Sequence, residues 1–234
     1  MKQWQTYLAE LLGTFVLVFG GTTSVVGALR GGLPPLLVAP FAFGLALMAG
    51  LYAFAEVSGG HFNPAVSIGL FLDRRIDGIT TLAYIVMQLA GATLASLVLL
   101  LASSKHAVAQ TATTPIAGDG PAFVIELVFS AIFVAVILQS TKSERFGGSA
   151  LVSIPLTLLM IHFAAIPFSG CGVNPARTFG PALVGDVWTG FWIYMIAPPL
   201  GAVIAWVVHT VVVGGQTNLG ASLSSGDGGA AGAA

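Results

Sequence analysis

Six apolar stretches of about membrane-spanning length dominate this chain of 234 residues. A helix needs about 20 predominantly apolar residues to cross the hydrocarbon core of a bilayer. The six stretches cover residues 4–26, 34–54, 79–101, 122–139, 149–167 and 188–213. The pattern therefore predicts an all-α membrane protein with six transmembrane helices.

The composition supports a membrane protein and excludes several other classes. Charged residues make up 7% of the chain and the mean hydropathy is +0.94, far from the composition of soluble domains. A net charge of −1 without a basic run gives no footprint for nucleic acid. Cys171 is the only cysteine, so we expect no internal disulfide, and no Cys/His cluster predicts a metal or cofactor.

The first apolar stretch is predicted to be retained. It is longer than the core of a signal peptide, lacks a convincing cleavage site and contains Glu10. A carboxylate within an apolar span is costly and is therefore a candidate functional group.

Two shorter segments, "NPAVSIGLFL" and "NPARTFGPALV", lie between the second and third and between the fifth and sixth spans. Both are helical in composition but only about ten residues long. At a rise of 1.5 Å per residue, each helix reaches about 15 Å, or half of the ~30 Å hydrocarbon core. We therefore expect two half-spanning, re-entrant helices.

The two halves of the chain form an internal repeat. Three pairs of matching residues recur at offsets of 116, 111 and 110: Glu10 with Glu126, Asn63 with Asn174, and Gly91 with Gly201. Because each copy contains three spans, the second copy runs inverted in the membrane, and one half-helix enters from each face. The small residues around Gly91 and Gly201 further predict that the third and sixth spans approach closely.

The repeat sets the predicted domain organisation. Residues 1–213 form one transmembrane channel domain, with repeat one at 4–101, a polar connector at 102–120 and repeat two at 121–213. Residues 214–234 are rich in Gly, Ala and Ser and are predicted to be a disordered tail.

The basic residues predict the orientation. Five of them fall on one predicted side of the membrane and two on the other: Lys2, Arg74, Arg75, Lys142 and Arg145, against Arg30 and Lys105. The positive-inside bias then places both termini in the cytoplasm of a multi-pass protein in the cell (inner) membrane.

Each half-helix begins with Asn, Pro and Ala. Asn63 and Asn174 fit helix caps, and Pro64 and Pro175 fit the first helical position, where no N–H donor is needed. We expect both Asn amide NH₂ groups to stay free and to face one cavity at the membrane centre. A water molecule that accepts from both amides points its hydrogens outward, which breaks a proton-relay chain, and the positive helix ends repel cations. The motif predicts a neutral-solute pore that rejects protons.

The paired segments "SGGHFNPAV" and "GCGVNPAR", with Ala65 and Ala176 in their motifs, resemble those of the aquaporins, or major intrinsic proteins. The resemblance covers nearly the whole chain apart from the tail. It implies a water-selective channel of the bacterial type, with water as the permeant, no enzymatic activity and no cofactor. It also implies homotetramers with one pore in each subunit.

The resemblance also implies which residues select the permeant. The narrowest point would be formed by four residues that match the family's positions: Phe43, His162, Cys171 and Arg177. Glycerol-conducting relatives usually carry a small residue in place of the His, and often Asp after "NPAR", where this chain has Thr178. Water is therefore favoured over glycerol, and we expect the Cys171 thiol to be accessible from the pore.

Four further residues receive roles around the pore. His61 resembles the pore-lining histidine of the cytoplasmic entrance. Glu10 and Glu126 are expected to accept hydrogen bonds from the loops that lead into the half-helices. Glu56 replaces a histidine that many water channels carry, and its effect on the inner mouth stays open.

Three alternative functions share some of these features. A facilitator of glycerol or another small neutral solute belongs to the same class. A coupled secondary transporter also uses inverted repeats and broken helices, but its ionisable candidates here, Glu10 and Glu126, look structural. An intramembrane enzyme with Cys171 as nucleophile and His162 as base would lack a third, orienting group.

Overall fold

The computed structural model describes residues 2–142 and 148–214. Within these ranges all regular secondary structure is helical. Six long helices are apolar enough to cross a membrane: α1 (Gln3–Arg30), α2 (Pro35–Ser58), α4 (Gly78–Ala102), α6 (Asp119–Lys142), α8 (Ala150–Ser169) and α10 (Phe191–Val212). The six predicted spans are confirmed.

The sixth span begins later than predicted. Residue 188 was expected to start it, but α10 starts at Phe191. Gly190 has a φ of 63°, which lies in the left-handed region that glycine adopts without steric cost. The chain turns there, and Trp188 stays in the turn before the helix.

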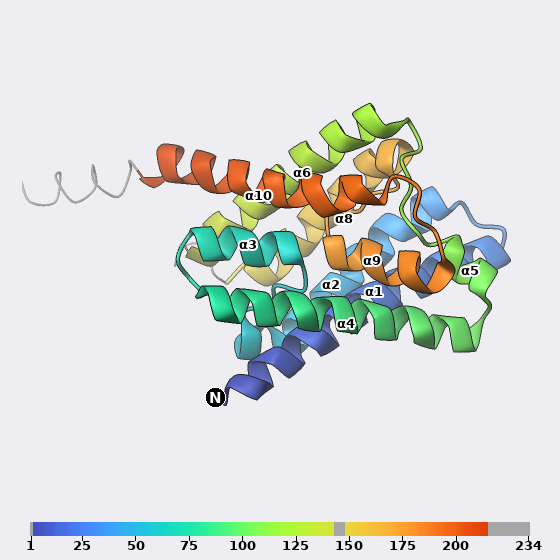
Figure 1. Cartoon of the computed structure of the whole chain (residues 1–234), viewed down its shortest axis with the longest axis horizontal. Helices are drawn as coiled ribbons and strands as arrows, with labels where there is room; N and C mark the ends of the chain where they lie inside the picture. Colours follow the sequence, from blue (N-terminus) through green and yellow to red (C-terminus); the bar gives the residue numbers. More distant parts are fainter. Residues whose placement is uncertain (1, 143–147, 215–234) are drawn as a thin grey trace, which may run out of the picture.

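Two short helices complete the membrane part. They are α3 (Pro64–Leu72), with nine residues, and α9 (Pro175–Gly185), with eleven. Figure 1 shows them in opposite halves of the bundle, with their N-terminal ends toward its middle. Their length prevents either from crossing a bilayer alone, as the sequence predicted.

The two repeats pack alike. In the first, α1 packs against α2 and α4, and in the second, α6 packs against α8 and α10. A Cβ atom placed on Gly91 would overlap the carbonyl oxygen of Leu11, and one on Gly201 would overlap that of Leu127. The small residues therefore bring α4 against α1 and α10 against α6, within each repeat.

The polar connector between the repeats contains regular structure. It contains a short helix, α5 (Lys105–Ala109), whose N-cap Ser104 accepts a hydrogen bond from the N–H of Ala107. This helix packs against α9 (Figure 1). Farther along, the N–H of Ala117 donates to the carbonyl of Phe168. The connector thus covers the end of the bundle that holds the second half-helix.

The helix order places both described chain ends on one side. Helix α1 begins and α10 ends at the same end of the bundle, at the left in Figure 1. The loop that carries Arg74 and Arg75 lies at this end too, between α3 and α4. Arg145 and the tail at 215–234 lie outside the described residues.

The close approach of α4 and α1 leads to a stability prediction. Gly91→Ala should destabilise the protein by about 1–3 kcal/mol, because its methyl group would overlap backbone that cannot move aside. Gly27→Ala on α1 is the control, since nothing lies within 4 Å of a Cβ at that position. Thermal unfolding in detergent should show a lower midpoint for Gly91→Ala alone, and equal midpoints for both variants would contradict the packing.

Candidate pore and its constriction

Both half-helices begin with the same cap. The side-chain oxygen of Asn63 accepts from the N–H of Ala65 at 2.9 Å. That of Asn174 accepts from the N–H groups of Ala176 and Arg177 at 2.9 and 3.2 Å. These bonds satisfy backbone donors that a helix N-terminus otherwise leaves unpaired.

The two caps also bind each other's loops. Asn63 Nδ2 donates to the carbonyl of Val173 at 2.8 Å, and Asn174 Nδ2 donates to the carbonyl of Phe62 at 2.9 Å. An amide NH₂ has two hydrogens. The expectation that the whole group is free is therefore wrong: one hydrogen of each asparagine joins the two half-helices, and one is left for another acceptor.

The residue before each asparagine has an unusual backbone conformation. Phe62 and Val173 have φ values of 48° and 43°, in the left-handed region that bulky and β-branched residues rarely adopt. Such residues cost of order 1–3 kcal/mol and persist only where the surroundings fix them. Here the side-chain amide of the opposite asparagine donates to the carbonyl of each of these residues. The buried N–H group of each residue needs an acceptor as well.

A buried glutamate holds the first loop. Glu10 on α1 is fully buried, and its two oxygens accept from the hydroxyl of Ser58 and from the N–H groups of His61 and Phe62, at 2.6, 3.0 and 2.8 Å. Gln88 on α4 adds a fourth hydrogen bond at 2.7 Å. The carboxyl group thus fixes the loop that leads into α3.

A second buried glutamate holds the second loop in the same way. Glu126 on α6 accepts from the hydroxyl of Ser169, at 2.6 Å, and from the N–H groups of Gly172 and Val173. In this loop, as in the first, the strained residue donates its N–H to a buried carboxyl oxygen.

Two further pairs of residues, which the sequence reasoning missed, complete this arrangement. Ser58 and Ser169 donate to the glutamates, and the hydroxyls of Tyr84 and Tyr194 donate to the carbonyls of these serines at 2.8 and 2.5 Å. The pairs recur at offsets of 111 and 110, so an alignment of the two repeats could have found them.

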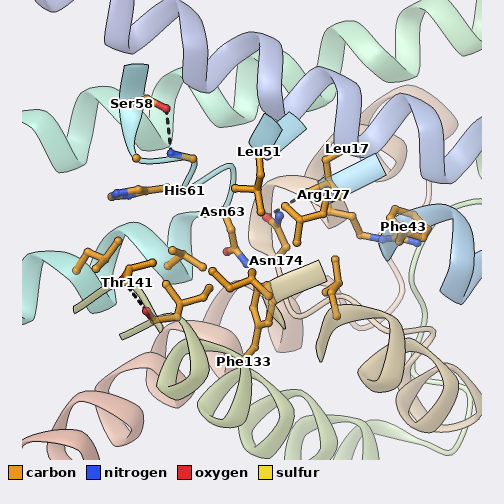
Figure 2. A pocket seen from close by; sticks show the side chains of 18 of the residues that line it. Leu17, Phe43, Leu51, Ser58, His61, Asn63, Phe133, Thr141, Asn174 and Arg177 are labelled. Carbon is orange, nitrogen blue, oxygen red and sulfur yellow. Dashed lines mark hydrogen bonds between the residues drawn. The ribbon is translucent and has the colours of Figure 1, made fainter. Parts of the chain in front are cut away.

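A cavity of about 270 Å³ runs along the half-helix termini. Figure 2 shows its labelled lining from Thr141 and His61 at one end, past Asn63 and Asn174, to Phe43 at the other. The rest of the wall is largely apolar and includes Leu17, Leu47, Leu51, Val66, Phe133, Ile137, Ile154 and Leu158. We call this space the inner cavity.

A second cavity, of about 220 Å³, lies toward the connector and is called the outer cavity. Its lining includes Gln110, Thr111 and Thr114 from the connector. Three residues line both cavities: Phe43, His162 and Arg177. These three side chains therefore form a constriction where the two cavities meet.

The constriction is tight and aromatic on one side. The rings of Phe43 and His162 stack with their centroids 4.7 Å apart, and the guanidinium carbon of Arg177 lies 4.6 Å from the Phe43 centroid. His162 Nδ1 lies 2.9 Å from the carbonyl oxygen of Leu158. A carbonyl oxygen can only accept, so Nδ1 carries a hydrogen and a neutral His162 exposes Nε2 as an acceptor.

Arg177 is buried and forms no direct ion pair with the described residues. One terminal nitrogen donates to the carbonyl of Thr111 at 3.1 Å. Within residues 2–142 and 148–214, no carboxylate lies within 4.0 Å of its guanidinium nitrogens. Its Nε and Nε2 of His162 are buried atoms with no hydrogen-bond partner among these residues. Such polar atoms are costly unless water or a ligand satisfies them.

Cys171 differs from its predicted geometry. Its neighbours Gly170 and Gly172 line the outer and the inner cavity, so the loop passes beside the constriction. The Cys171 side chain itself is fully buried in the apolar core and belongs to neither lining. Because Cys171 belongs to neither lining, the expected pore-accessible thiol is not found at either cavity.

The two remaining candidates lie at the inner end. His61 lines the inner cavity, and its ring makes an edge contact with Tyr84 at a centroid distance of 5.0 Å. Glu56 lies exposed on α2 and does not line either cavity. The structure thus brings His61, and not Glu56, to the path between the half-helices.

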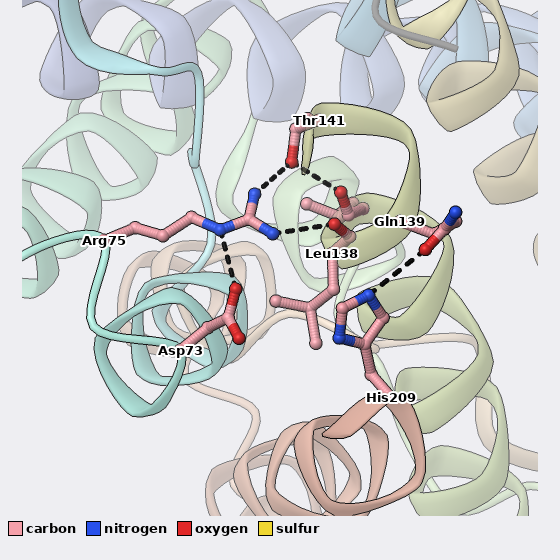
Figure 3. A network of polar contacts seen from close by, with 7 residues as sticks. Asp73, Arg75, Leu138, Gln139, Thr141 and His209 are labelled. Carbon is pink, nitrogen blue, oxygen red and sulfur yellow. Dashed lines mark hydrogen bonds and ion pairs between the residues drawn. The ribbon is translucent and has the colours of Figure 1, made fainter. Parts of the chain in front are cut away.

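Charged residues brace the mouth of the inner cavity (Figure 3). Arg75, which lines it, donates to Asp73 at 2.8 Å, to the hydroxyl of Thr141 at 2.6 Å and to a backbone carbonyl of α6 at 2.7 Å. His209 Nε2 lies 3.2 Å from the amide oxygen of Gln139 and links α10 to α6. Arg75 thus links the loop after α3 to α6 at this end of the cavity.

Comparison with known proteins identifies the family. The family model described as Major intrinsic protein matches residues 1–209. The chain belongs to the major intrinsic protein family. Members of this family are membrane channels rather than enzymes. No group of three or more potential metal ligands occurs in the described part of this channel.

Similar proteins within the family carry different names. The chain is 40% identical over 207 residues to Glycerol uptake facilitator protein-like 6 of Lactiplantibacillus plantarum. The matched residues make up 85% of this chain and 94% of that protein. It is 35% identical over 222 residues to Aquaporin Z of Photorhabdus laumondii, with 87% and 95% covered. The solved structure of the aquaglyceroporin from Plasmodium falciparum has the same fold, with a TM-score of 0.83 at 24% identity, over 93% of this chain and all of that one.

The buried carboxylates lead to a second prediction. In Glu126→Gln, an amide NH₂ replaces one oxygen and faces backbone donors, so at least one buried donor loses its acceptor, at a cost of about 1–3 kcal/mol. The same change at the exposed Glu56 is the matched control. Size-exclusion chromatography after heating should show loss of monodisperse protein at a lower temperature for Glu126→Gln, and equal profiles would contradict the role of Glu126.

Proposed function

We propose that this major intrinsic protein is a passive water channel that excludes protons and ions. The observation that carries the proposal is the constriction of Phe43, His162 and Arg177. Two of its groups lack a protein partner: one acceptor, His162 Nε2, and one donor, Arg177 Nε. A water molecule can donate to the first and accept from the second, while the stacked aromatic rings leave little room for a carbon chain.

The inner cavity supports rapid passage of a small polar molecule. Asn63 and Asn174 each keep one amide hydrogen, and much of the remaining wall is apolar. Few polar partners mean weak binding, and a channel conducts only what it binds weakly enough to release. Water would therefore exchange hydrogen bonds mainly at the asparagines and at the constriction.

Rejection of ions rests on charge. The positive ends of α3 and α9 and the charged guanidinium of Arg177, which has no ion-pair partner among the described residues, act on the same path. A hydrated cation would have to surrender water beside these positive groups. We propose that Phe43, His162 and Arg177 select the permeant, and that the Asn-Pro-Ala caps, residues 63–65 and 174–176, orient it.

Glycerol is the second candidate permeant. The relative at 40% identity is named as a glycerol uptake facilitator-like protein, so the family match alone leaves both solutes open. Stacking of His162 on Phe43 favours water, because a small residue at position 162 would widen the constriction. Thr178, which stands where glycerol-conducting relatives often carry Asp, also favours water.

The remaining proposals concern the setting. We place both termini in the cytoplasm of a cell (inner) membrane, since the loop with Arg74 and Arg75 lies at the end where α1 begins. Each subunit contains its own path, and we propose a homotetramer with one pore in each subunit.

Stopped-flow measurements on proteoliposomes test the choice of permeant. The wild type should shrink rapidly in an osmotic gradient, with glycerol entry at the rate of empty vesicles. His162→Ala should raise glycerol entry by roughly tenfold, the effect of removing about 1.4 kcal/mol from the barrier. Phe163→Ala, the next residue on α8, is the control, because that ring contacts Phe41 and lines neither cavity.

Two results would contradict the proposal. Glycerol entry in the wild type as fast as water flow would make the protein a glycerol facilitator. Unchanged glycerol entry in His162→Ala, with water flow intact, would show that the His162 side chain does not limit the passage of glycerol.

A further inference from the structure

A chain of buried polar side chains connects the inner cavity to Glu10. His61, which lines the cavity, has its Nδ1 atom 3.0 Å from the hydroxyl oxygen of Ser67 on α3. Ser67 lies 2.9 Å from Nε2 of Gln88 on α4, and the same Nε2 lies 2.7 Å from Glu10. Ser67, Gln88 and Glu10 are fully buried. Every hydrogen in this chain must therefore find its acceptor within the protein.

The direction of the chain follows from Glu10. Its oxygens already accept from the hydroxyl of Ser58 and from the N–H groups of His61 and Phe62. A carboxylate can only accept, so Gln88 presents its NH₂ group to it. The second hydrogen of that NH₂ then goes to the oxygen of Ser67.

The hydroxyl of Ser67 has one hydrogen to donate. Its oxygen accepts from Gln88, and within the described ranges its only other hydrogen-bond partner is His61 Nδ1. Leaving that hydrogen unpaired in a fully buried position would be costly. Ser67 therefore donates to Nδ1, and a neutral imidazole that accepts at Nδ1 carries its hydrogen on Nε2.

We propose that Ser67 and Gln88 are positioning residues that hold His61 as the Nε2–H tautomer, so that the inner cavity receives a hydrogen-bond donor. The tautomer is set by protein contacts, and its effect on the permeant rests on the proposed water channel. The imidazole of His61 then presents a donor to the inner cavity, as the remaining amide hydrogens of Asn63 and Asn174 do. A water molecule there is held by its oxygen, with its hydrogens directed along the path.

The two histidines on the path are then opposites. His162 at the constriction donates from Nδ1 to Leu158 and exposes an acceptor. His61 at the inner end accepts at Nδ1 and exposes a donor. The same residue type thus supplies different hydrogen-bonding groups at the two positions, because a backbone carbonyl faces one ring and a hydroxyl donor faces the other.

The opposite direction of the chain requires a different charge state. If Glu10 carried a proton and the Gln88 amide were turned, Ser67 would donate to Gln88 and His61 would carry its hydrogen on Nδ1. The turned NH₂ group would then occupy the place of Gln88 Oε1, an atom that has no partner among the described residues. Two unpaired donors would replace one unpaired acceptor, which disfavours this direction. The tautomer of His61 distinguishes the two directions.

Nitrogen NMR of the full chain in lipid bilayers, with ¹⁵N-labelled histidine, tests the proposal. The chain has four histidines, and the signals absent from His61→Asn belong to His61. The wild type should show a protonated Nε2 and an unprotonated Nδ1. Ser67→Ala removes the donor to Nδ1, and Gln88→Met lets the Ser67 oxygen accept from the ring, so both should give mixed tautomers.

Ser96→Ala on α4 is the matched control. That serine is also fully buried, but its hydroxyl donates only to Ala92 in its own helix, so the His61 signals should not change. A protonated Nδ1 in the wild type, or a pure Nε2–H tautomer in both Ser67→Ala and Gln88→Met, would overturn the proposal. The wild-type spectrum decides alone if a variant fails to fold.

Osmotic shrinkage of the same samples separates this proposal from the proposed function. A wild type with the Nε2–H tautomer but no water flow would contradict the channel and leave the positioning role intact. Water flow with a protonated Nδ1 would do the reverse.

Discussion

The hydrogen bonds between two buried glutamates and two loops support the rest of the structure. Each half-helix must start at mid-membrane, where no bulk water can satisfy a loop. Glu10 and Glu126 accept the N–H groups of Phe62 and Val173, the residues with left-handed backbone. The conformation that turns each loop into its helix is therefore held by a carboxyl group from α1 or α6. Without these acceptors, the N–H groups of the two strained residues would be buried and unpaired.

Once the loops are held, the two asparagines meet. Each caps its own helix, binds the opposite loop with one amide hydrogen and keeps the other. This shared use of one side chain explains why the motif occurs twice: each copy needs the carbonyl that the other copy's loop presents. The positive helix ends, the apolar wall and the constriction all line the inner cavity. In the proposed function, selection of a neutral, hydrogen-bonding solute is a consequence of this lining.

The sequence predicted the features that depend on chain length and on the repeat. The six spans, the short α3 and α9 and the burial of Glu10 follow from the cost of placing polar groups in lipid. It could not predict features set by tertiary contacts. Asn63 and Asn174 each give one amide hydrogen to a carbonyl that lies more than 100 residues away in the chain. The absence of Cys171 from both linings is a tertiary feature, and the support of Arg177 by Thr111 depends on how the connector folds over the outer cavity.

The central claim is that two asparagines, joined at mid-membrane, orient a file of water so that it cannot carry protons. Water and proton fluxes measured on the same reconstituted vesicles, by osmotic shrinkage and by the decay of an imposed pH gradient, test it most directly. The account predicts water flow far above that of empty vesicles, with the pH gradient decaying no faster than in empty vesicles. Decay of the pH gradient that rises in proportion to water flow would contradict it.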